Sequence, residues 1–367
     1  MPQSIADLET PVPIVDLDRL ARNLDRAAEY ATAHRIALRP HIKTHKSPRI
    51  AGEQLRRGAV GVTCATPYEA EVMADVCDDI LVAYPPVGGK RAARLAALGE
   101  TVKLTVALDS LQAIEDLAQA AREADRTIHV YVELDLGMHR VGVPGVAEAI
   151  ELARAVRDRP PLVFEGIAFY PGHVREPVGE QASKLEQLSA AVGDAVNQFD
   201  RAGLRPAVVS GGSTPTLWRT HELVGVNEFR PGTYVYNDRT TAAVGACAWD
   251  DCALTVLATV VSTAVPNQAV IDAGTKALGR EPMRGADADG FGCVLEHPDV
   301  IVKAMSEEHG MLDLSKSSWR PQVGERVRII PNHVCIVVHL NDVIAGVRGD
   351  VVETSWPVTA RGRGYAI

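Results

Sequence analysis

The stretch Ile36-Ala37-Leu38-Arg39-Pro40-His41-Ile42-Lys43-Thr44-His45-Lys46 joins a short apolar run to a cluster of basic side chains. If the apolar run ends a β-strand, the period of two places His41, Lys43 and His45 on one face, so that a lysine lies between two imidazoles. A lysine in such surroundings loses its proton more readily, and its free amine can form a Schiff base with an aldehyde. A solvated basic turn would have the same composition, and only the rest of the chain discriminates between the two.

Around this stretch, short apolar runs alternate with segments of helical period, as in βα units that build a parallel sheet. The predicted strands are Ala37–Lys43, Ala59–Cys64, Asp79–Tyr84, Lys103–Leu108, Ile128–Asp135, Val163–Tyr170, Pro206–Ser210 and Val226–Arg230. The predicted helices are Leu17–Arg35, Pro67–Cys77, Lys90–Leu98, Leu111–Ala124, Val146–Arg157 and Gln181–Ala202. Eight such units predict an α/β fold with an N-terminal (β/α)8 TIM-type barrel, whose chemistry takes place at the C-terminal ends of its strands.

The pattern changes after Asp238, where β-forming runs follow one another with little helical period between them. These predicted strands are Leu254–Val265, Ala269–Asp272, Val327–Pro331, Val334–His339, Val343–Val347 and Val351–Trp356. We therefore predict two domains, a barrel over residues 12–238 and a C-terminal β-rich domain over residues 239–367 that also takes in residues 1–11.

Composition excludes several classes of function. The 367 residues carry a formal net charge of -9, and no basic run compensates for it, so we expect no nucleic-acid partner. The N-terminus lacks the features of a signal peptide, and no window approaches the roughly 18 apolar residues of a membrane span. The six cysteines are scattered and form no CxxC motif, which argues against a disulfide framework or a zinc ribbon. We expect a cytoplasmic protein with no membrane partner.

Two glycine-containing segments follow the last two strands of the predicted barrel. They are Ser210-Gly211-Gly212-Ser213-Thr214 and Arg230-Pro231-Gly232-Thr233-Tyr234. TIM barrels build phosphate sites at this position, because glycines let backbone N–H groups approach a phosphate and hydroxyls add donors. A tight turn without function would use the same residues. Together with an imine-forming lysine, however, a phosphate anchor is what pyridoxal 5′-phosphate requires.

The second domain contains the segment Pro331-Asn332-His333-Val334-Cys335. On a strand, residues two apart share a face, so the imidazole of His333 and the thiolate of Cys335 can meet one metal ion. Taken alone, the pair is more commonly two buried side chains, since two ligands make an incomplete site.

These segments, together with the turn Met138-His139-Arg140, resemble the D-threonine aldolase and D-serine dehydratase family of alanine-racemase-like, fold-type III pyridoxal-phosphate enzymes. The resemblance covers nearly the whole chain. It implies that Lys43 holds the cofactor as a Schiff base, that Arg140 contacts the ring and that Tyr170 lies beside it. Lys46 lies beyond the predicted strand end, where a helix start or solvent contact accounts for it. The predicted cofactor-binding residues are Lys43, Arg140, Tyr170, Ser210, Gly211, Gly212, Ser213, Thr214, Gly232, Thr233 and Tyr234.

The resemblance also implies a metal and a reaction. Members of the family carry a divalent metal on a His-x-Asp or His-x-Cys pair at this place, so we predict that His333 and Cys335 hold zinc, manganese or magnesium. The expected substrate is a D-3-hydroxy amino acid. In a retro-aldol cleavage to glycine and an aldehyde, His173 or a metal-bound water takes the hydroxyl proton. In the alternative, a β-elimination to a 2-oxo acid and ammonia, Lys43 removes the α-proton.

The sequence leaves the choice between these reactions open and favours the aldolase. Cys335 resembles the dehydratase branch, whereas residues 333–342 and 356–362 resemble the aldolases. The run Tyr170-Pro171-Gly172-His173 departs from the Tyr-x-Gly-Ser-x-x-His arrangement of some aldolases, which leaves the identity of the base open.

Two further alternatives and the assembly also follow from the resemblance. A non-catalytic pyridoxal-phosphate carrier would lack the second domain. A racemase would need a tyrosine base from that domain, and the one tyrosine after Asp238 is Tyr365. The resemblance suggests a homodimer in which the β-rich domain of one chain closes the barrel of the other.

Overall fold

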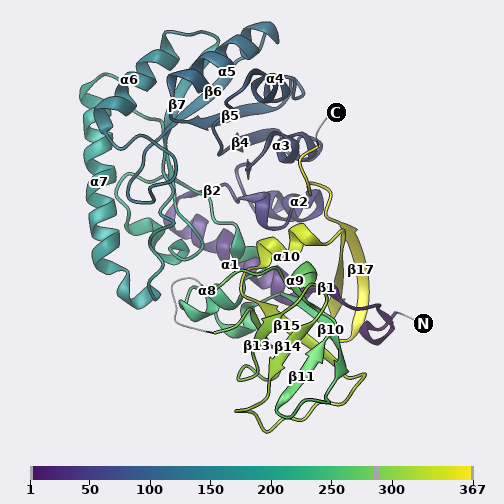
Figure 1. Ribbon diagram of the computed structural model, residues 1–367. Coiled ribbons are helices and arrows are strands. Elements are labelled where there is room, and N and C mark those ends of the chain that lie inside the picture. The colour runs from purple at the N-terminus through teal and green to yellow at the C-terminus, as the bar shows by residue number, and fades with distance from the viewer. Residues whose placement is uncertain (1–2, 284–288, 365–367) are drawn as a thin grey trace.

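The computed structural model describes residues 3–283 and 289–364, which form an eight-stranded sheet and a nine-stranded sheet in two adjoining parts (Figure 1). The strands of the first sheet are β2 (Ala37–Leu38), β3 (Val62–Cys64), β4 (Asp79–Val82), β5 (Lys103–Leu108), β6 (Ile128–Glu133), β7 (Leu162–Ala168), β8 (Val208–Gly211) and β9 (Glu228–Phe229). Each strand pairs in parallel with its neighbours in the order β2-β9-β8-β7-β6-β5-β4-β3.

Backbone contacts between the two ends of this order close the sheet into a barrel. The amide of Val60 donates to the carbonyl of Leu38 at 2.9 Å, and the amide of Thr63 donates to the carbonyl of Pro40 at 2.8 Å. A parallel bridge between His41 and Thr63 continues this contact. The predicted (β/α)8 TIM-type barrel is therefore confirmed.

Helices cover the outside of the barrel, and six of them are the six that the sequence predicts. In α5, for example, Ser110 caps the first turn, and Ala113, Ile114, Leu117 and Ala121 are buried at helical spacing against the strands. The helices of this part of the chain are α1 (Leu17–His34), α2 (Pro48–Arg56), α3 (Pro67–Met73), α4 (Gly89–Ala96), α5 (Leu111–Glu123), α6 (Val146–Arg157), α7 (Ala182–Arg201) and α8 (Arg239–Ala243). None of the helices in the described ranges has the length and apolar composition of a membrane span.

The nine-stranded sheet is built mostly from antiparallel pairs and forms the strand-rich part at the bottom of Figure 1. Its strands are β1 (Val12–Asp16), β10 (Leu254–Ser262), β11 (Gln268–Ile271), β12 (Gly292–Val294), β13 (Val302–Met305), β14 (Gly310–Asp313), β15 (Arg326–Pro331), β16 (Val343–Arg348) and β17 (Val351–Pro357). The first of them, β1, pairs with β10 and β16. Residues 12–16 thus lie in the second sheet, although the predicted barrel range begins at residue 12. The sequence did not reveal this pairing because the partner strands are more than 230 residues away.

The predicted strand Val334–His339 is wrong, because this segment forms the helix α10 (Val334–Leu340). Its β-branched, apolar composition is typical of a strand, yet Val334, Val337 and Val338 are the buried residues and follow the i, i+3, i+4 spacing of one helical face. In Figure 1, α10 lies at the junction of the two parts. A short helix, α9 (Thr275–Leu278), packs against it.

The predicted strand Ala37–Lys43 is also too long. Only Ala37 and Leu38 pair as β2, Pro40 has no N–H to donate, and the chain then turns into the 3-10 helix η2 (Ile42–Thr44). His41, Lys43 and His45 therefore do not share one face of a strand, although the sequence predicted that they would. His45 is fully buried, and its Nε2 lies 3.1 Å from Oε1 of Gln54.

Gly166 in β7 tests the close spacing of the barrel strands. A Cβ at this position would lie 2.1 Å from the backbone oxygen of Val208 in β8. Because that neighbour is backbone, Gly166→Ala is expected to destabilise the protein by about 3 kcal/mol. In the matched variant Gly193→Ala, a Cβ in the middle of α7 meets open space and should stabilise by about 0.5–1 kcal/mol. Urea unfolding followed by tryptophan fluorescence checks both, and equal midpoints for the two variants would contradict the packing described.

Candidate active site at the barrel mouth

A cavity of about 200 Å³ lies where the C-terminal strand ends of the barrel meet the start of α10. It brings together Lys43 with His333 and Cys335, which are about 290 residues further along the chain. Most of its side chains are polar. The residues that line it are His41, Lys43, Ala83, Glu133, Met138, Arg140, Tyr170, Arg175, Ser213, Thr214, Pro215, Arg230, Gly232, Thr233, His333 and Cys335.

Lys43 reaches this cavity from η2, which is anchored by the buried side chains of Ile42 and Thr44. Its Nζ lies 5.8 Å from the centroid of the Tyr170 ring, and the guanidinium of Arg140 lies 4.9 Å from the same centroid. Within the described ranges, Nζ has no hydrogen-bond or ion-pair partner. The structure thus brings together the three residues predicted to hold and flank the cofactor ring, and leaves the amine free.

His41 caps η2 and lines the cavity beside the lysine. Its Nδ1 accepts a hydrogen bond from the backbone amide of Lys43 at 3.4 Å. Burial, together with the positive charges of Lys43 and Arg230, holds the pKa of His41 well below its usual value. The imidazole is therefore neutral near pH 7 and carries its proton on Nε2, where it can donate a hydrogen bond.

The loops after β8 and β9 form a small polar cradle at one end of the cavity. Ser213 and Thr214 are buried, and the backbone amide of Tyr234 donates to Oγ1 of Thr214 at 3.2 Å. Gly232 approaches η2 so closely that a Cβ would lie 2.8 Å from Oγ1 of Thr44 and 3.0 Å from the carbonyl oxygen of His41. Hydroxyls and exposed backbone amides around such a glycine are the groups that bind a phosphate.

Four of the predicted cofactor residues do not line the cavity. Gly211 packs against Phe169, Gly212 has a positive φ of 88°, and the hydroxyl of Tyr234 accepts from Nε2 of Gln54 at 2.9 Å. Ser210 is fully buried behind the cavity. These four residues shape the loops next to the cavity and do not line the cavity itself.

A buried chain of hydrogen bonds holds Arg230 at the wall of the cavity. Its Nη1 donates to Oγ of Ser210, which donates to Oε1 of Glu228 at 2.6 Å. The other carboxylate oxygen of Glu228 accepts from Nε of Arg39 at 2.7 Å. Nη2 of Arg230 donates to the carbonyl of Phe169 at 2.9 Å. The chain fixes the guanidinium of Arg230 and balances its charge inside the barrel.

Glu133 is the carboxyl group that lines the cavity. Its side chain is buried at the end of β6, and burial raises the pKa of this carboxyl although the charges of Arg230 and Arg140 oppose the rise. A carboxyl with a raised pKa in a cavity is a candidate for holding or moving a proton.

His333 and Cys335 face each other across the start of α10. Nδ1 of His333 lies 3.1 Å from the buried carboxylate of Asp238, and Sγ of Cys335 lies 3.2 Å from Oγ1 of Thr44. Attraction to the Cys335 thiolate raises the pKa of His333 well above its usual value. Burial opposes ionisation of Cys335, but the charge of His333 outweighs it and lowers the pKa of the thiol to about 7. The described residues contain no group of three or more possible metal ligands.

His173 is close to the cavity but is not among the residues that line it. Its ring packs against Gly137, and its Nδ1 is buried without a hydrogen-bond partner within the described ranges. Burial lowers the pKa of His173, so its imidazole is neutral near pH 7. Lys46, expected at a helix start or in solvent, is instead buried in an ion pair with Glu69. Tyr365 lies outside the described residues.

Two family models match the chain in succession. Residues 15–240 match the model described as alanine racemase, N-terminal domain, and residues 253–347 match the model described as putative serine dehydratase domain. The chain belongs to the D-threonine aldolase and D-serine dehydratase family. Membership in this family of alanine-racemase-like enzymes makes the protein a pyridoxal-phosphate-dependent lyase.

Relatives in this family span nearly the full chain. A 3-hydroxy-D-aspartate aldolase of Paracoccus denitrificans (strain Pd 1222) is 34% identical, over 98% of this chain and 94% of its own. A D-threo-3-hydroxyaspartate dehydratase of Delftia sp. (strain HT23) is 34% identical, over 91% of this chain and 93% of its own. The crystal structure of D-threonine aldolase from Filomicrobium marinum has a TM-score of 0.89 and 34% identity, and the match covers 98% of both chains.

Several residues in the cavity of this family member were not among the predicted site residues. Glu133 and Arg230 lie at the C-terminal ends of predicted strands, where TIM barrels carry their active sites. Their position could therefore have identified them as site residues. Arg175 follows His173 in the loop after β7. The pairing of Asp238 with His333 joins the ends of two domains, and no local sequence pattern signals it.

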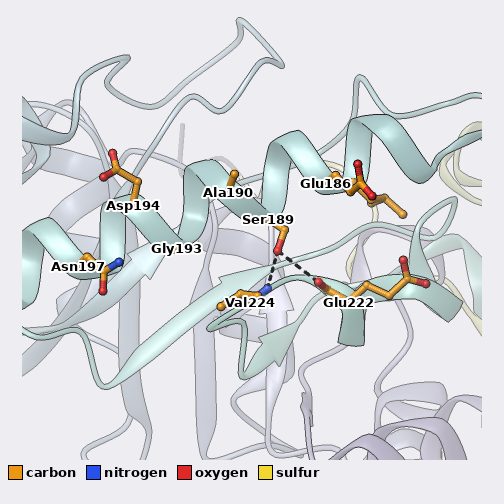
Figure 2. A pocket seen from close by; sticks show the side chains of 9 residues that line it. Glu186, Ser189, Ala190, Gly193, Asp194, Asn197, Glu222 and Val224 are labelled. Carbon is orange, nitrogen blue, oxygen red and sulfur yellow. Dashed lines mark hydrogen bonds between the residues drawn. The ribbon is translucent and has the colours of Figure 1, made fainter.

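A second, open cavity of about 510 Å³ lies along α7, away from the barrel mouth (Figure 2). The side chains of Glu186, Asp194 and Glu222 make its rim acidic. Its hydroxyl group, on Ser189, already donates to the carbonyl of Glu222 at 3.2 Å and accepts from the amide of Val224 at 2.9 Å. The lining of this groove, all of it within the described residues, therefore contains no lysine or arginine and no free hydroxyl or thiol.

Proposed function

We propose that the protein cleaves D-3-hydroxy amino acids by a retro-aldol reaction to glycine and an aldehyde, with pyridoxal 5′-phosphate and a divalent metal. The observation that carries the proposal is the convergence, in one cavity, of a lysine amine, unpaired within the described residues, with a phosphate-type cradle and the pair His333 and Cys335. The relative named as a 3-hydroxy-D-aspartate aldolase, 34% identical over nearly the whole chain, supports it.

The residues present fit pyridoxal phosphate. Lys43 would hold its aldehyde carbon, Tyr170 and Arg140 would flank its ring, and Ser213, Thr214, Gly232 and Thr233 would hold its phosphate. The close approach of Gly232 to η2, which a Cβ would fill, supports the phosphate position. When bound, the cofactor supplies an electron sink for the carbanion that bond cleavage leaves at Cα.

The residues also fit a divalent metal. A histidine whose Nδ1 is held by a buried carboxylate presents Nε2 as a ligand in a fixed orientation, and this is the arrangement of His333 with Asp238. A bound metal ion itself deprotonates a coordinating thiol, and thiolate with imidazole suits zinc. When bound, the metal supplies Lewis acidity toward the hydroxyl group of the substrate.

The chain's own residues would then orient the substrate and move protons. Within the described ranges the amine of Lys43 has no hydrogen bond or ion pair, and it would exchange with the amino group of the substrate. We propose that His173, which lies beside the cavity without lining it, accepts the hydroxyl proton, because burial lowers its pKa and keeps its imidazole neutral near pH 7. Glu133, whose pKa is raised by burial, is a second group at the cavity wall that would exchange protons.

A second candidate is the β-elimination that yields a 2-oxo acid and ammonia. Lys43 would remove the α-proton, which its unpaired Nζ permits. The dehydratase of Delftia sp., also 34% identical, supports this candidate, and so does the thiolate ligand Cys335.

The products of the purified protein distinguish the two reactions. With pyridoxal phosphate, a divalent metal and D-threonine or D-3-hydroxyaspartate, the aldolase is expected to release glycine together with acetaldehyde or glyoxylate. A 2-oxo acid and ammonia would establish the dehydratase instead. No product from any D-3-hydroxy amino acid, including D-serine, would refute both.

The location and assembly that we propose, a homodimer in the cytoplasm, rest on the sequence and the family resemblance. The cavity already combines barrel residues with His333 and Cys335 from one chain. In such a dimer, a second chain would therefore close the cavity rather than supply its metal ligands.

A further inference from the structure

We propose that Arg175 binds a carboxylate on the substrate side chain, so that the enzyme prefers D-3-hydroxyaspartate to D-threonine. This inference rests on the proposed function and concerns its substrate. It begins with the balance of charge in the cavity. His333 and Cys335 balance each other's charge in this cavity, and the other acidic group in its lining is the carboxyl of Glu133. Against these stand four lysine and arginine side chains, Lys43, Arg140, Arg175 and Arg230.

Three of the four cations already have a function or a partner. Lys43 would form the Schiff base. Arg140 stacks on Tyr170, 4.9 Å from the ring centroid, where the cofactor ring is expected. Arg230 is buried and donates to Ser210 and to the carbonyl of Phe169. Arg175 remains as the cation without an assigned partner.

The guanidinium of Arg175 is oriented but not neutralised. Its Nε donates to the carbonyl of Gly172, and no carboxylate lies within ion-pair distance of it in the described part of the chain. The adjacent Glu176 instead pairs with Lys184. Both terminal nitrogens of Arg175 therefore remain available, and their spacing matches the two oxygens of a carboxylate.

The loop that carries Arg175 is held against the wall of the cavity. A Cβ at Gly172 would lie 2.2 Å from Cε1 of Tyr170 and 2.9 Å from Sδ of Met138, so the backbone at this point packs tightly on both side chains. The carbonyl that fixes Arg175 belongs to this same glycine. The guanidinium is thus positioned before a ligand binds, which reduces the entropy lost on binding a carboxylate.

A substrate with two carboxylates matches these groups better than one with a methyl group. The α-carboxylate is common to all amino acids, whereas the side-chain carboxylate distinguishes 3-hydroxyaspartate from threonine. An arginine that binds only the second carboxylate changes the reaction of one substrate and leaves the other nearly unchanged.

The test compares two substrates and two ligands of the holoenzyme. Arg175→Gln is expected to lower kcat/KM for D-3-hydroxyaspartate by about 100-fold, mainly through KM, and to change the value for D-threonine by less than about 3-fold. Arg175→Lys should recover part of the loss, because lysine restores the charge but cannot bind both carboxylate oxygens as a planar guanidinium does. Arg205→Gln, which removes an exposed arginine, is the control and should change neither value.

Binding of D-aspartate and D-alanine, followed by the visible spectrum of the bound cofactor, separates this inference from the proposed function. Neither ligand carries a hydroxyl group to cleave. Arg175→Gln should lower the binding affinity for D-aspartate by about 100-fold and leave the affinity for D-alanine unchanged, even if the protein cleaves no substrate. An equal loss for both ligands would place Arg175 at the α-carboxylate and overturn the inference, as would no loss for either.

Discussion

Lys43→Ala is expected to abolish the visible absorption band of the bound cofactor and to lower turnover by about 10⁴-fold or more. The side chain ends in the only group of η2 that can form a Schiff base, and no hydrogen bond or ion pair holds its Nζ within the described ranges. Absorption between the near-ultraviolet and the visible, together with product release, checks both effects.

The free amine of Lys43 also predicts that the variant folds normally. Because Nζ lies near the Tyr170 ring and has no hydrogen bond or ion pair within the described ranges, the thermal midpoint should change little. Lys43→Arg is the matched control, because it keeps the positive charge and cannot form a Schiff base. A variant that keeps the absorption band would refute the assignment of Lys43.

His333→Ala is expected to lower turnover by about 10³-fold while the cofactor band remains. The substitution removes one of two proposed metal ligands and leaves the residues around Lys43 in place. Metal content measured on the purified protein should fall from about one ion per chain toward zero, since one of the two proposed protein ligands is lost.

The effect of His333→Ala is separable from a loss of folding. The carboxylate of Asp238 keeps hydrogen bonds from the amides of Thr241 and Val334, so its burial remains partly compensated. His309→Ala removes an exposed histidine outside the cavity and should keep both metal and activity. Unchanged metal content and turnover in His333→Ala would contradict the proposed metal pair.

The barrel could be predicted from the sequence because its signals are local. Strands such as Lys103–Leu108 are mostly apolar and buried, and helices such as α5 begin at a capping serine and bury one face. The strands β2 and β9 have only two residues each, so their predicted lengths were too great. The pairing of these two short strands joins segments about 190 residues apart, and no local pattern contains it.

The second domain was harder to predict for two physical reasons. The segment of α10 is rich in valine, which favours strands, and tertiary packing against η2 and α9 overrides that preference. The partners of β1 lie at the other end of the chain, and pairing between such distant segments leaves no mark on the composition of either.

The candidate site was predictable as a set of strand ends but not as a network. Lys43, Arg140, Tyr170, His333 and Cys335 do meet in one cavity. The chain from Arg39 through Glu228 and Ser210 to Arg230 was not foreseen, because each member is an ordinary polar residue in its own segment. Lys46 was misplaced for the same reason, since its buried partner Glu69 lies in α3, beyond the helix that follows Lys46.

The position of the Schiff base tests the central claim most directly. Borohydride reduction of the holoenzyme converts a Schiff base to a stable secondary amine, and peptide mass spectrometry then locates the pyridoxyl group. The structure predicts a label on Lys43 alone, because Lys43 lines the cavity with a free amine whereas Lys46 is buried against Glu69. A label on Lys46 or on any other lysine, or no label on a protein that binds the cofactor, would contradict the account.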